Sequence, residues 1–515
     1  MNLFSWLGRK KYSHTTKSKP DHPLPPSARS EPISLSLEHN LHKLGDLFTD
    51  TPDMIIRTLV LPDTGEQAAL VYLEGLSDKN AINNNVIKPI AGGIGSIESA
   101  SVTVGRVGRL REWGPITNAI LKGSSVLFID GRTDAILLGT EGWPQRAIED
   151  PQLETSLKGA HQGFIESSGQ NIALLRRYLP HQELKIREHQ VGRRGDTRVS
   201  IIYIADVTNP EVLKELEDRI RHLDVDVIIN TGELAELIED NPYSPFPQLL
   251  LTERPDTAAS QLVQGRIVVL VDRSPSVIVG PATFVSFFQS VDDYSTRWSI
   301  ATFIRMLRFF AFFVAICLPA FYIAVSSYNF ELIPVKLLLT IGEYRGSVPF
   351  SPFIEAIFME ITLEMMREAG VRLPAPVGQT VGIVGGIVIG QAIVQAGLIS
   401  NIMVIVVSFT AIASFILPNY DFVAGVRIIR FLMMIAASFF GLFGIVVGLM
   451  TLTGHLISLE SLGTPFGSPF APMRWSDWKD TFVRAPLWKM IKRPVSTKAL
   501  QSIRQGDNKH KGEGS

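Results

Sequence analysis

The sequence has almost no cysteine, because Cys317 is the only one among 515 residues. A single thiol forms no disulfide within the chain and cannot build a metal cluster. HExxH, GxSxG and GxxxxGK[ST] motifs are also missing, so zincin, α/β-hydrolase and P-loop interpretations have no support. No Lys/Arg stripe with interleaved aromatics crosses the regions expected to fold, which argues against nucleic-acid binding. We therefore expect no enzyme, no metal site and no cofactor.

The N-terminus lacks the order of a secretory signal. Its few apolar residues precede Arg9, Lys10 and Lys11, whereas a signal places its charges first and has a longer apolar core. We expect no cleaved signal and a cytoplasmic N-terminal half. Residues 1–37 combine Lys, Ser and Pro without periodicity, which predicts a disordered basic tail.

Long apolar runs are absent before about residue 297, where charged and apolar residues alternate as in a soluble protein. Strand-like runs are expected at 54–61, 68–73, 125–129, 135–138, 199–205, 225–229, 267–271 and 277–279. Helical spacing is expected at 37–48, 171–179, 210–223 and 257–263. Asp130-Gly131 supplies the positive φ angles of a tight hairpin turn. These patterns predict two α/β subdomains, 38–150 and 151–290.

Long apolar runs appear from residue 308 to 455, and a helical span needs roughly 20 mostly apolar residues, so the membrane domain is expected at 291–455. We expect an α-helical polytopic membrane domain there, with a re-entrant or interfacial segment at 332–373 and spans near 307–325, 377–399, 402–417 and 431–452. Residues 456–515 form a basic cytoplasmic tail. Basic residues flank the first and last spans, which predicts that both termini are cytoplasmic and the number of crossings even. Four crossings fit, and six stay open if 332–341 and 350–370 each cross.

Two of the expected spans carry glycines at helical spacing, which lets helix backbones approach closely in lipid. The glycines are Gly382, Gly386 and Gly390 in the second span, and Gly444 and Gly448 in the fourth. We interpret them as a helix-packing surface, within a subunit or between subunits. Glycine is also common in membrane helices without such a role.

The segment 351–373 mixes apolar residues with carboxylates. At ~100° per residue, Glu360, Glu364 and Arg367 share a face, while Glu355 points elsewhere. Carboxylates around a water-filled lumen attract cations, so Glu355, Glu360 and Glu364 are candidate pore-lining residues. An amphipathic helix at the membrane surface is the alternative, and Arg367 is placed to pair with Glu364 or Glu360.

A motif in the second expected subdomain resembles the PFPQ…ERPD signature of the A subunits of bacterial spore germinant receptors. It runs from Pro245 to Asp256 and includes Pro245, Pro247, Glu253, Arg254, Pro255 and Asp256. The resemblance continues through 280–282, 292–294, 349–352, 372–374 and 418–420 and ends near 470–472, so it covers most of the chain beyond residue 38.

This resemblance implies a membrane subunit of a nutrient germinant receptor in the inner spore membrane. In such receptors the A subunit works beside a transporter-like B subunit and a lipoprotein C subunit, and A subunits oligomerise around a pore that releases monovalent cations. For Glu253, Arg254 and Asp256 we favour a structural role, with Asp256 as an N-cap after Pro255. A membrane-anchored scaffold and a self-contained transporter remain the alternative functions.

Overall fold

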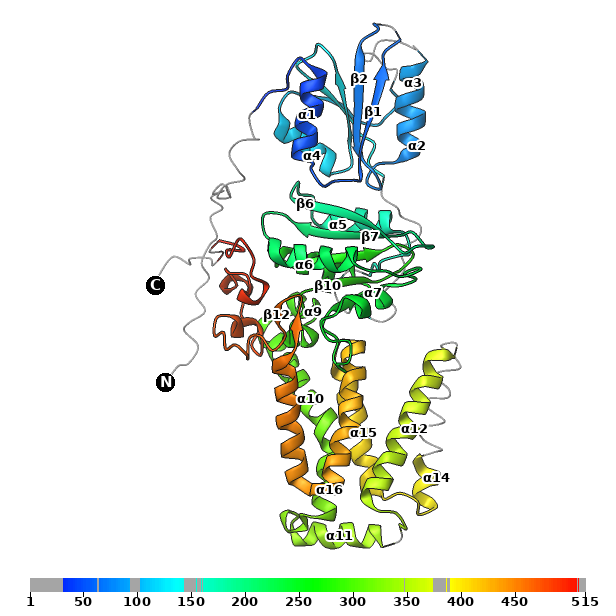
Figure 1. The fold of residues 1–515 in the computed structure, drawn as a ribbon, viewed down its shortest axis with the longest axis vertical. Coiled ribbons are helices and arrows are strands. Elements are labelled where there is room, and N and C mark those ends of the chain that lie inside the picture. Colours follow the sequence, from blue (N-terminus) through cyan, green and yellow to red (C-terminus); the bar gives the residue numbers. More distant parts are fainter. Residues whose placement is uncertain are drawn as a thin grey trace, which may run out of the picture.

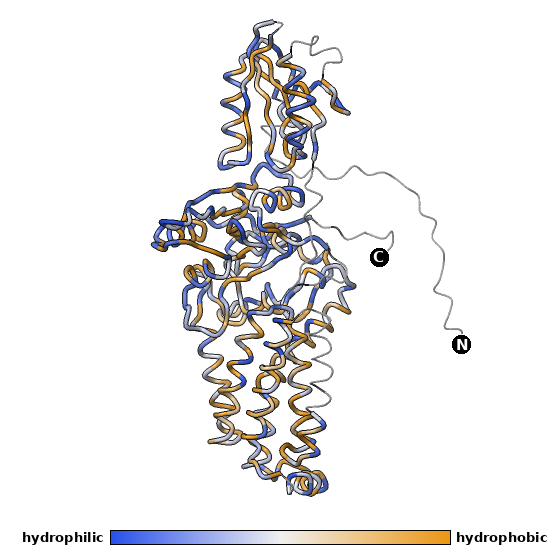
Figure 2. The backbone as a smooth tube through the Cα atoms, turned by 90° about the vertical axis from the view of Figure 1, so that its right-hand side faces the viewer, coloured by the Kyte–Doolittle hydropathy of each residue, from blue (hydrophilic) through white to orange (hydrophobic). Residues whose placement is uncertain are grey.

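The computed structural model describes residues 31–62, 64–92, 102–142, 154, 159, 161–346, 348–373, 386, 390–506 and 508. Figure 1 shows three parts in a column: a first sheet with its helices, a second sheet with its helices, and a group of long helices. The hydropathy colours of Figure 2 are mixed over the sheets and largely hydrophobic over the long helices. The predicted tail up to residue 30 and most of the predicted span 377–399 lie outside the described residues.

The first sheet has five antiparallel strands in the order β1-β2-β4-β5-β3. They are β1 (Met54–Val60), β2 (Gln67–Leu73), β3 (Val107–Leu110), β4 (Ser125–Ile129) and β5 (Ala135–Leu138). Successive side chains of a strand point to opposite faces, so the sheet carries two apolar cores. One core is closed by α1 (Leu37–Leu47) and α4 (Trp113–Leu121). The other is closed by α2 (Lys79–Ala81), η1 (Ile82–Ile87) and α3 (Lys88–Ala91).

The second sheet repeats this arrangement, with the order β6-β7-β9-β10-β8. Its strands are β6 (Leu184–Val191), β7 (Thr197–Ile204), β8 (Leu250–Thr252), β9 (Ile267–Val271) and β10 (Val277–Gly280). One core is closed by α6 (Pro210–Arg221) and α7 (Thr231–Ile238). The other lies under α5 (Ser168–Tyr178) and α8 (Pro255–Val263) and is continuous with the core of the long helices.

Side-chain contacts match between the two sheets as well as the strand order. Asp130 accepts a hydrogen bond from the first backbone N–H of α1 at 2.9 Å, and Asp272 accepts one from the first N–H of α5 at 3.3 Å. The Asn40 side chain bonds both backbone groups of Ser34, and the Asn171 side chain bonds both backbone groups of Ile165. The two sheet units are therefore structural repeats of each other.

The predicted strand at 225–229 is wrong. These residues form an irregular segment whose backbone carbonyls accept hydrogen bonds from the β6–β7 turn, for example from Arg193 to Val225 at 2.9 Å. Thr197 Oγ1 also donates to the Ile228 carbonyl at 2.9 Å. The apolar side chain of Ile228 is buried in the second sheet's core, so burial without sheet pairing produced the strand-like pattern.

The helical part contains α10 (Trp298–Ser327), α11 (Val335–Arg345), α12 (Pro352–Arg372), α14 (Gly390–Gln395), α15 (Asn401–Ile416) and α16 (Tyr420–Ser458). Pro319 lies inside α10. Among the described residues, α10 and α16 are long and apolar enough to cross a membrane. The expected span 307–325 lies inside α10, and the acidic segment 351–373 forms α12 beside α15 and α10.

α16 is not one continuous helix, because Gly441 has a φ of 59° and a ψ of −140°. Beyond it the chain folds back, so that a Cβ at Gly444 would overlap the Ala436 carbonyl and one at Gly448 would overlap the Met433 sulfur. The two arms, 420–440 and 442–458, thus lie side by side as a helical hairpin. The expected single span 431–452 runs across this reversal and is corrected to parts of two helices.

The segment after α16 folds back onto the second sheet instead of continuing the helices (Figure 1). It contains β11 (Glu460–Ser461), β12 (Thr464–Pro465) and the short helical turns η5 (Asp477–Asp480), η6 (Leu487–Lys489) and η7 (Val495–Thr497). Leu500 donates its N–H to the Val207 carbonyl at 2.8 Å, and Arg493 Nε donates to the Val263 carbonyl at 2.8 Å. Much of the expected basic tail is therefore packed on the second sheet unit.

Candidate coupling site between the second sheet and the helices

The PFPQ segment holds both ends of the α16 hairpin. Phe246 is fully buried, with its ring 5.5 Å from that of Phe422 near the start of α16 and 6.4 Å from that of His455 near its end. Ser244 Oγ lies 3.0 Å from His455 Nε2. A Cβ at Gly425 would overlap the Pro245 carbonyl, so this close approach requires glycine.

The ERPD segment opens α8 and forms a buried ion pair. Arg254 is 3% exposed, and its guanidinium binds Asp256 at 2.8 and 3.0 Å and Asp292 at 3.4 Å. Pro255 occupies the first helical position, where its missing N–H costs nothing. The N-cap is Arg254 and not Asp256, which corrects the sequence prediction. Asp256 instead lies in the first turn and accepts the Thr257 N–H at 2.8 Å.

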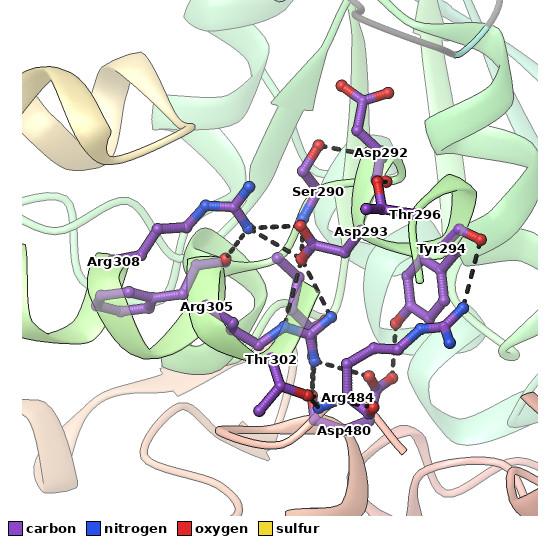
Figure 3. A network of polar contacts seen from close by, with 12 residues as sticks. Ser290, Asp292, Asp293, Tyr294, Thr296, Thr302, Arg305, Arg308, Asp480 and Arg484 are labelled. Carbon is purple, nitrogen blue, oxygen red and sulfur yellow. Dashed lines mark hydrogen bonds and ion pairs between the residues drawn. The ribbon is translucent and has the colours of Figure 1, made fainter. Parts of the chain in front are cut away.

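Two buried arginines at the start of α10 join the helices to the second sheet unit and to the C-terminal segment (Figure 3). Arg305 binds Asp293 at 3.1 Å and Asp480 at 2.7 Å, and Arg308 binds Asp293 at 2.9 Å. Tyr294 donates its hydroxyl to Asp480 at 2.6 Å, and burial raises the pKa of this phenol. In the sequence these arginines served only as an orientation signal, and their carboxylate partners were missed.

The three candidate pore carboxylates of α12 all point toward other elements, including Glu355, which the helical spacing placed on another face. The remaining acidic residue of α12, Glu368, is exposed and pairs with Arg372 of the same helix. Glu355 and Glu360 are fully buried, and the Glu364 side chain is 29% exposed. Glu360 binds Arg430 of α16 at 2.5 Å, and Glu364 binds Arg427 at 2.6 Å.

The other partners of these carboxylates come from nearby segments. Glu364 also binds Arg367 at 2.9 Å, which is one of the two pairings expected from helical spacing. Glu355 accepts the Ser400 N–H at 2.9 Å and lies 3.9 Å from Arg345. Each candidate pore carboxylate is thus within 4 Å of an arginine of the same chain.

The glycines divide into two groups. A Cβ at Gly386 or Gly390 would meet nothing within 4 Å among the described residues, whereas Gly444 and Gly448 sit at the hairpin contact. Gly382 lies outside the described residues. No group of three or more His, Cys, Asp or Glu side chains suited to a metal ion occurs in the part of the chain that the structure describes.

A polar cavity of about 440 Å³ lies where the second sheet unit meets the loop between α15 and α16. Its walls include Glu154, Arg254, Asp292 and Arg308, together with residues 415–419. Burial raises the pKa of Glu154 to about 7, opposed by the Thr252 hydrogen bond and Arg254 and reinforced by Glu253 and Asp256. The cavity therefore touches both the ERPD ion pair, through Arg254 and Asp292, and the buried Arg308 of α10.

Two α/β repeats, the second joined by buried ion pairs to apolar helices of membrane-crossing length, define the class of protein: an α/β domain carried on a helical domain. The family model for GerA, described as Bacillus/Clostridium GerA spore germination protein, matches residues 42–496. The chain belongs to this family of spore germination proteins.

Sequence relatives agree with that assignment. The chain is 39% identical over 486 residues to Spore germination protein KA of Bacillus subtilis (strain 168), covering 92% of this chain and 89% of the relative. It is 39% identical over 472 residues to Spore germination protein GerLA of Bacillus cereus, covering 89% and 96%. It is 38% identical over 473 residues to the uncharacterized membrane protein YfkQ of B. subtilis, covering 90% and 92%.

The chain is also similar to the crystal structure of the N-terminal domain of the A subunit of the Bacillus megaterium spore germinant receptor GerK3. The identity is 28% and the TM-score 0.40, over 50% of this chain and 98% of that one.

Proposed function

We propose that this chain is the membrane subunit of a nutrient germinant receptor in bacterial spores, and that several copies form a ligand-gated channel whose cation release initiates germination. Membership of the spore germination family supports the receptor assignment. The partners are a transporter-like B subunit, a lipoprotein C subunit, further copies of this chain and membrane lipids. The location is the inner spore membrane, crossed several times.

The observation that carries the channel proposal is the two-sidedness of α12. Its carboxylates face arginines of neighbouring elements, whereas Ile354, Phe358, Ile361 and Met365 are exposed on its other side. A bare apolar face on a helix of this kind calls for lipid or another subunit. Glu364 remains partly exposed, and a ring of such carboxylates contributed by several copies would concentrate cations.

The sidedness proposal rests on where the helices begin and end. The start of α10 is bound to Asp293, which follows the second sheet unit, and α16 ends beside Ser244, so both connect to the second sheet unit. A helical part that leaves and returns on the same side makes an even number of crossings, with both termini cytoplasmic. Cysteine labelling after Arg29 and after Lys498 is expected to give the same sidedness, and labelling from opposite sides refutes it.

Reversal potentials across asymmetric KCl test the channel. Purified protein in planar bilayers is expected to carry a cation-selective current. Glu364→Gln lowers that selectivity, Glu364→Lys lowers it further, and Arg367→Gln raises it, because each changes the charge beside the pathway. Glu331→Gln is the matched control, since Glu331 is an exposed carboxylate on the turn before α11.

A channel formed elsewhere would give cation current with identical reversal potentials in all these variants. Absence of any current from correctly assembled protein would favour the scaffold. Transport of a nutrient without channel current would favour the self-contained transporter.

A further inference from the structure

The two sheet units provide an internal comparison, because they correspond without insertion from Arg111 to Glu141 and from Glu253 to Thr283. Gly123 and Gly265, at matching places after α4 and α8, both have a φ of 91°. The next residue in each unit donates its backbone N–H to an equivalent carbonyl of the preceding helix, at 3.1 Å in the first unit and 3.2 Å in the second. Those next residues are Ser124 in the first unit and Arg266 in the second.

In the first unit the residue at this position, Ser124, has a neutral side chain whose hydroxyl is hydrogen-bonded. Ser124 is buried, and its hydroxyl donates to Glu141 Oε1 at 2.5 Å. In the second unit the serine is replaced by arginine, and Thr283 stands where Glu141 stands in the first. A cation has therefore been gained and a carboxylate lost at the same place. Because the fold forms with serine there, the arginine is not needed to build the unit.

Arg266 is buried without a counter-charge among the described residues. It is 4% exposed, and its Nη2 donates to Ser286 Oγ at 2.8 Å. Its Nε and Nη1 find no hydrogen-bond partner in the described part of the chain. Burial lowers the pKa of this guanidinium to about 10, partly offset by the nearby Tyr294 phenol. An unpaired buried charge of this kind is costly and calls for an anion.

Arg266 does not line the junction cavity itself but contacts residues that do. Its partner Ser286 lines that cavity, as do Gln261, whose carbonyl accepts the Arg266 N–H, and Tyr294. The Gln261 side-chain oxygen is likewise buried without a hydrogen-bond partner among the described residues. Beside the cavity, Arg266 therefore has two unused N–H donors, and Gln261 has one unused acceptor oxygen.

Two other arginines, Arg254 and Arg308, line the cavity themselves and differ from Arg266 because each already has carboxylate partners. Arg254 binds Asp256 and Asp292, and Arg308 binds Asp293. Of these three arginines, Arg266 is the one without a carboxylate partner among the described residues.

We propose that the junction cavity binds a small oxyanion, carrying a carboxylate or phosphate group, whose negative charge is balanced by Arg266. The cavity volume of about 440 Å³ is in the range of small-molecule sites, which is roughly 300–1,000 Å³. Ser286, Gln264 and Thr257 supply neutral hydrogen-bonding groups in its walls. The site lies between the second sheet unit and the α15–α16 loop, so its occupant contacts both parts of the molecule.

Thermal unfolding of the full-length protein in a neutral detergent tests this site. Inorganic phosphate and acetate are titrated against sodium chloride at matched ionic strength, and phosphatidylglycerol against phosphatidylcholine in mixed micelles. The variant is Arg266→Ser, the residue that the first unit uses at this position. Arg193→Ser is the matched control, because Arg193 is an exposed arginine paired with Asp224 on the same unit.

We expect the wild type and the control to be stabilised by phosphate or acetate, and Arg266→Ser to bind the same anion at least about tenfold more weakly. The variant without added anion should unfold at a higher temperature than the wild type, since an unpaired buried charge has been removed. Stabilisation by phosphatidylglycerol alone, lost in Arg266→Ser, assigns the oxyanion to a lipid headgroup.

Three results overturn the proposal. They are no stabilisation of the wild type by any of the anions, equal stabilisation of wild type and Arg266→Ser, and failure of Arg266→Ser to fold, which would make the arginine a structural residue. None of these results bears on channel current, so the site and the proposed channel stand or fall separately.

Discussion

Glu360 and Arg430 form a charge pair with almost no access to solvent, since their side chains are 0% and 1% exposed. Removing one member strands the other charge in an apolar surrounding, which costs about 3–5 kcal/mol, whereas replacing both by apolar groups is often neutral. We expect Glu360→Leu and Arg430→Met each to lower the unfolding temperature strongly, and the double variant to recover most of the loss. Thermal unfolding in detergent measures the cycle.

The exposed pair Glu368–Arg372 is the control for this cycle, because its side chains are 65% and 77% exposed. Glu368→Leu should cost less than about 1 kcal/mol. Strictly additive losses in the Glu360 and Arg430 double variant would contradict the pairing.

Glu154 gives a second test, through pH. Its pKa is raised from 4.5 to about 7 in the folded protein, so the folded state holds the proton more tightly than the unfolded state. The stability contributed by that proton is fully present below about pH 4.5 and is lost as the pH rises through about 7. Glu154→Gln cannot lose the proton. We expect the unfolding temperature of Glu154→Gln to gain on the wild type between about pH 5 and pH 8; a constant difference would show that Glu154 titrates normally.

Residue spacing in α12 predicted the ion pair within that helix but not the ion pairs that its carboxylates form with α16. Glu364 and Arg367 are three positions apart on one helix, so their contact follows from helical geometry. Arg427 and Arg430 lie 63 and 70 residues from their carboxylate partners, and nothing in the periodicity of α12 indicates them. The signal that was present is a charge at the edge of an apolar run, which generally marks a buried pair in such segments.

Gly441 is the position on which the shape of α16 depends. A side chain at this φ and ψ strains the backbone by about 1–3 kcal/mol, and a Cβ would also come within 3.0 Å of Tyr328 and Asn329. We expect Gly441→Ala to lower the unfolding temperature in detergent. Gly454→Ala is the control, because Gly454 lies in the same helix with open space around it. Equal unfolding temperatures for the two variants would argue against the reversal.

Hydropathy finds apolar elements but not their ends. The run around 431–452 is apolar on both sides of Gly441, so the reversal leaves no mark in a hydrophobicity profile. The strand expected at 225–229 failed for a related reason, since burial in a core produces the same apolar pattern as sheet pairing. The Asp130-Gly131 turn signal correctly predicted that β4 and β5 pair as a hairpin. The turn is not the tight one expected, because the connection runs from 130 to 134 and Gly131, not Asp130, has a positive φ.

At the scale of the whole molecule, the glycines of the α12–α15 region bear on assembly. Because a Cβ at Gly386 would have no neighbour within 4 Å among the described residues, Gly386→Leu should leave the single subunit's fold intact. If helices of two subunits meet there, the branched side chain will reduce oligomer size in detergent. Gly454→Leu, also in open space, is the control. An unchanged oligomer with unchanged stability would place the Gly386 face toward lipid.

The duplication of the sheet unit escaped the sequence patterns, although both subdomains were expected. The two units share their strand order and a few capping side chains, such as Asp130 and Asp272. Few of the other equivalent positions carry the same residue type in both units. Contacts of this kind become visible only when the residues are placed in space. The exchange of Ser124 for Arg266 has meaning only after that placement.

Because the PFPQ loop contacts both ends of α16, the position of the second sheet is coupled to both arms of this helix. Pro245 touches the first arm at Gly425, and Ser244 touches the second arm at His455, so a tilt of the second sheet moves both arms together. We expect the two arms of α16 to rotate together as a rigid unit about their contact with the second sheet, without separating from each other. We expect the resulting shear to fall where α16 meets α12, on the bonds of Glu360 with Arg430 and of Glu364 with Arg427. These two ion pairs would therefore resist movement of α16 relative to α12.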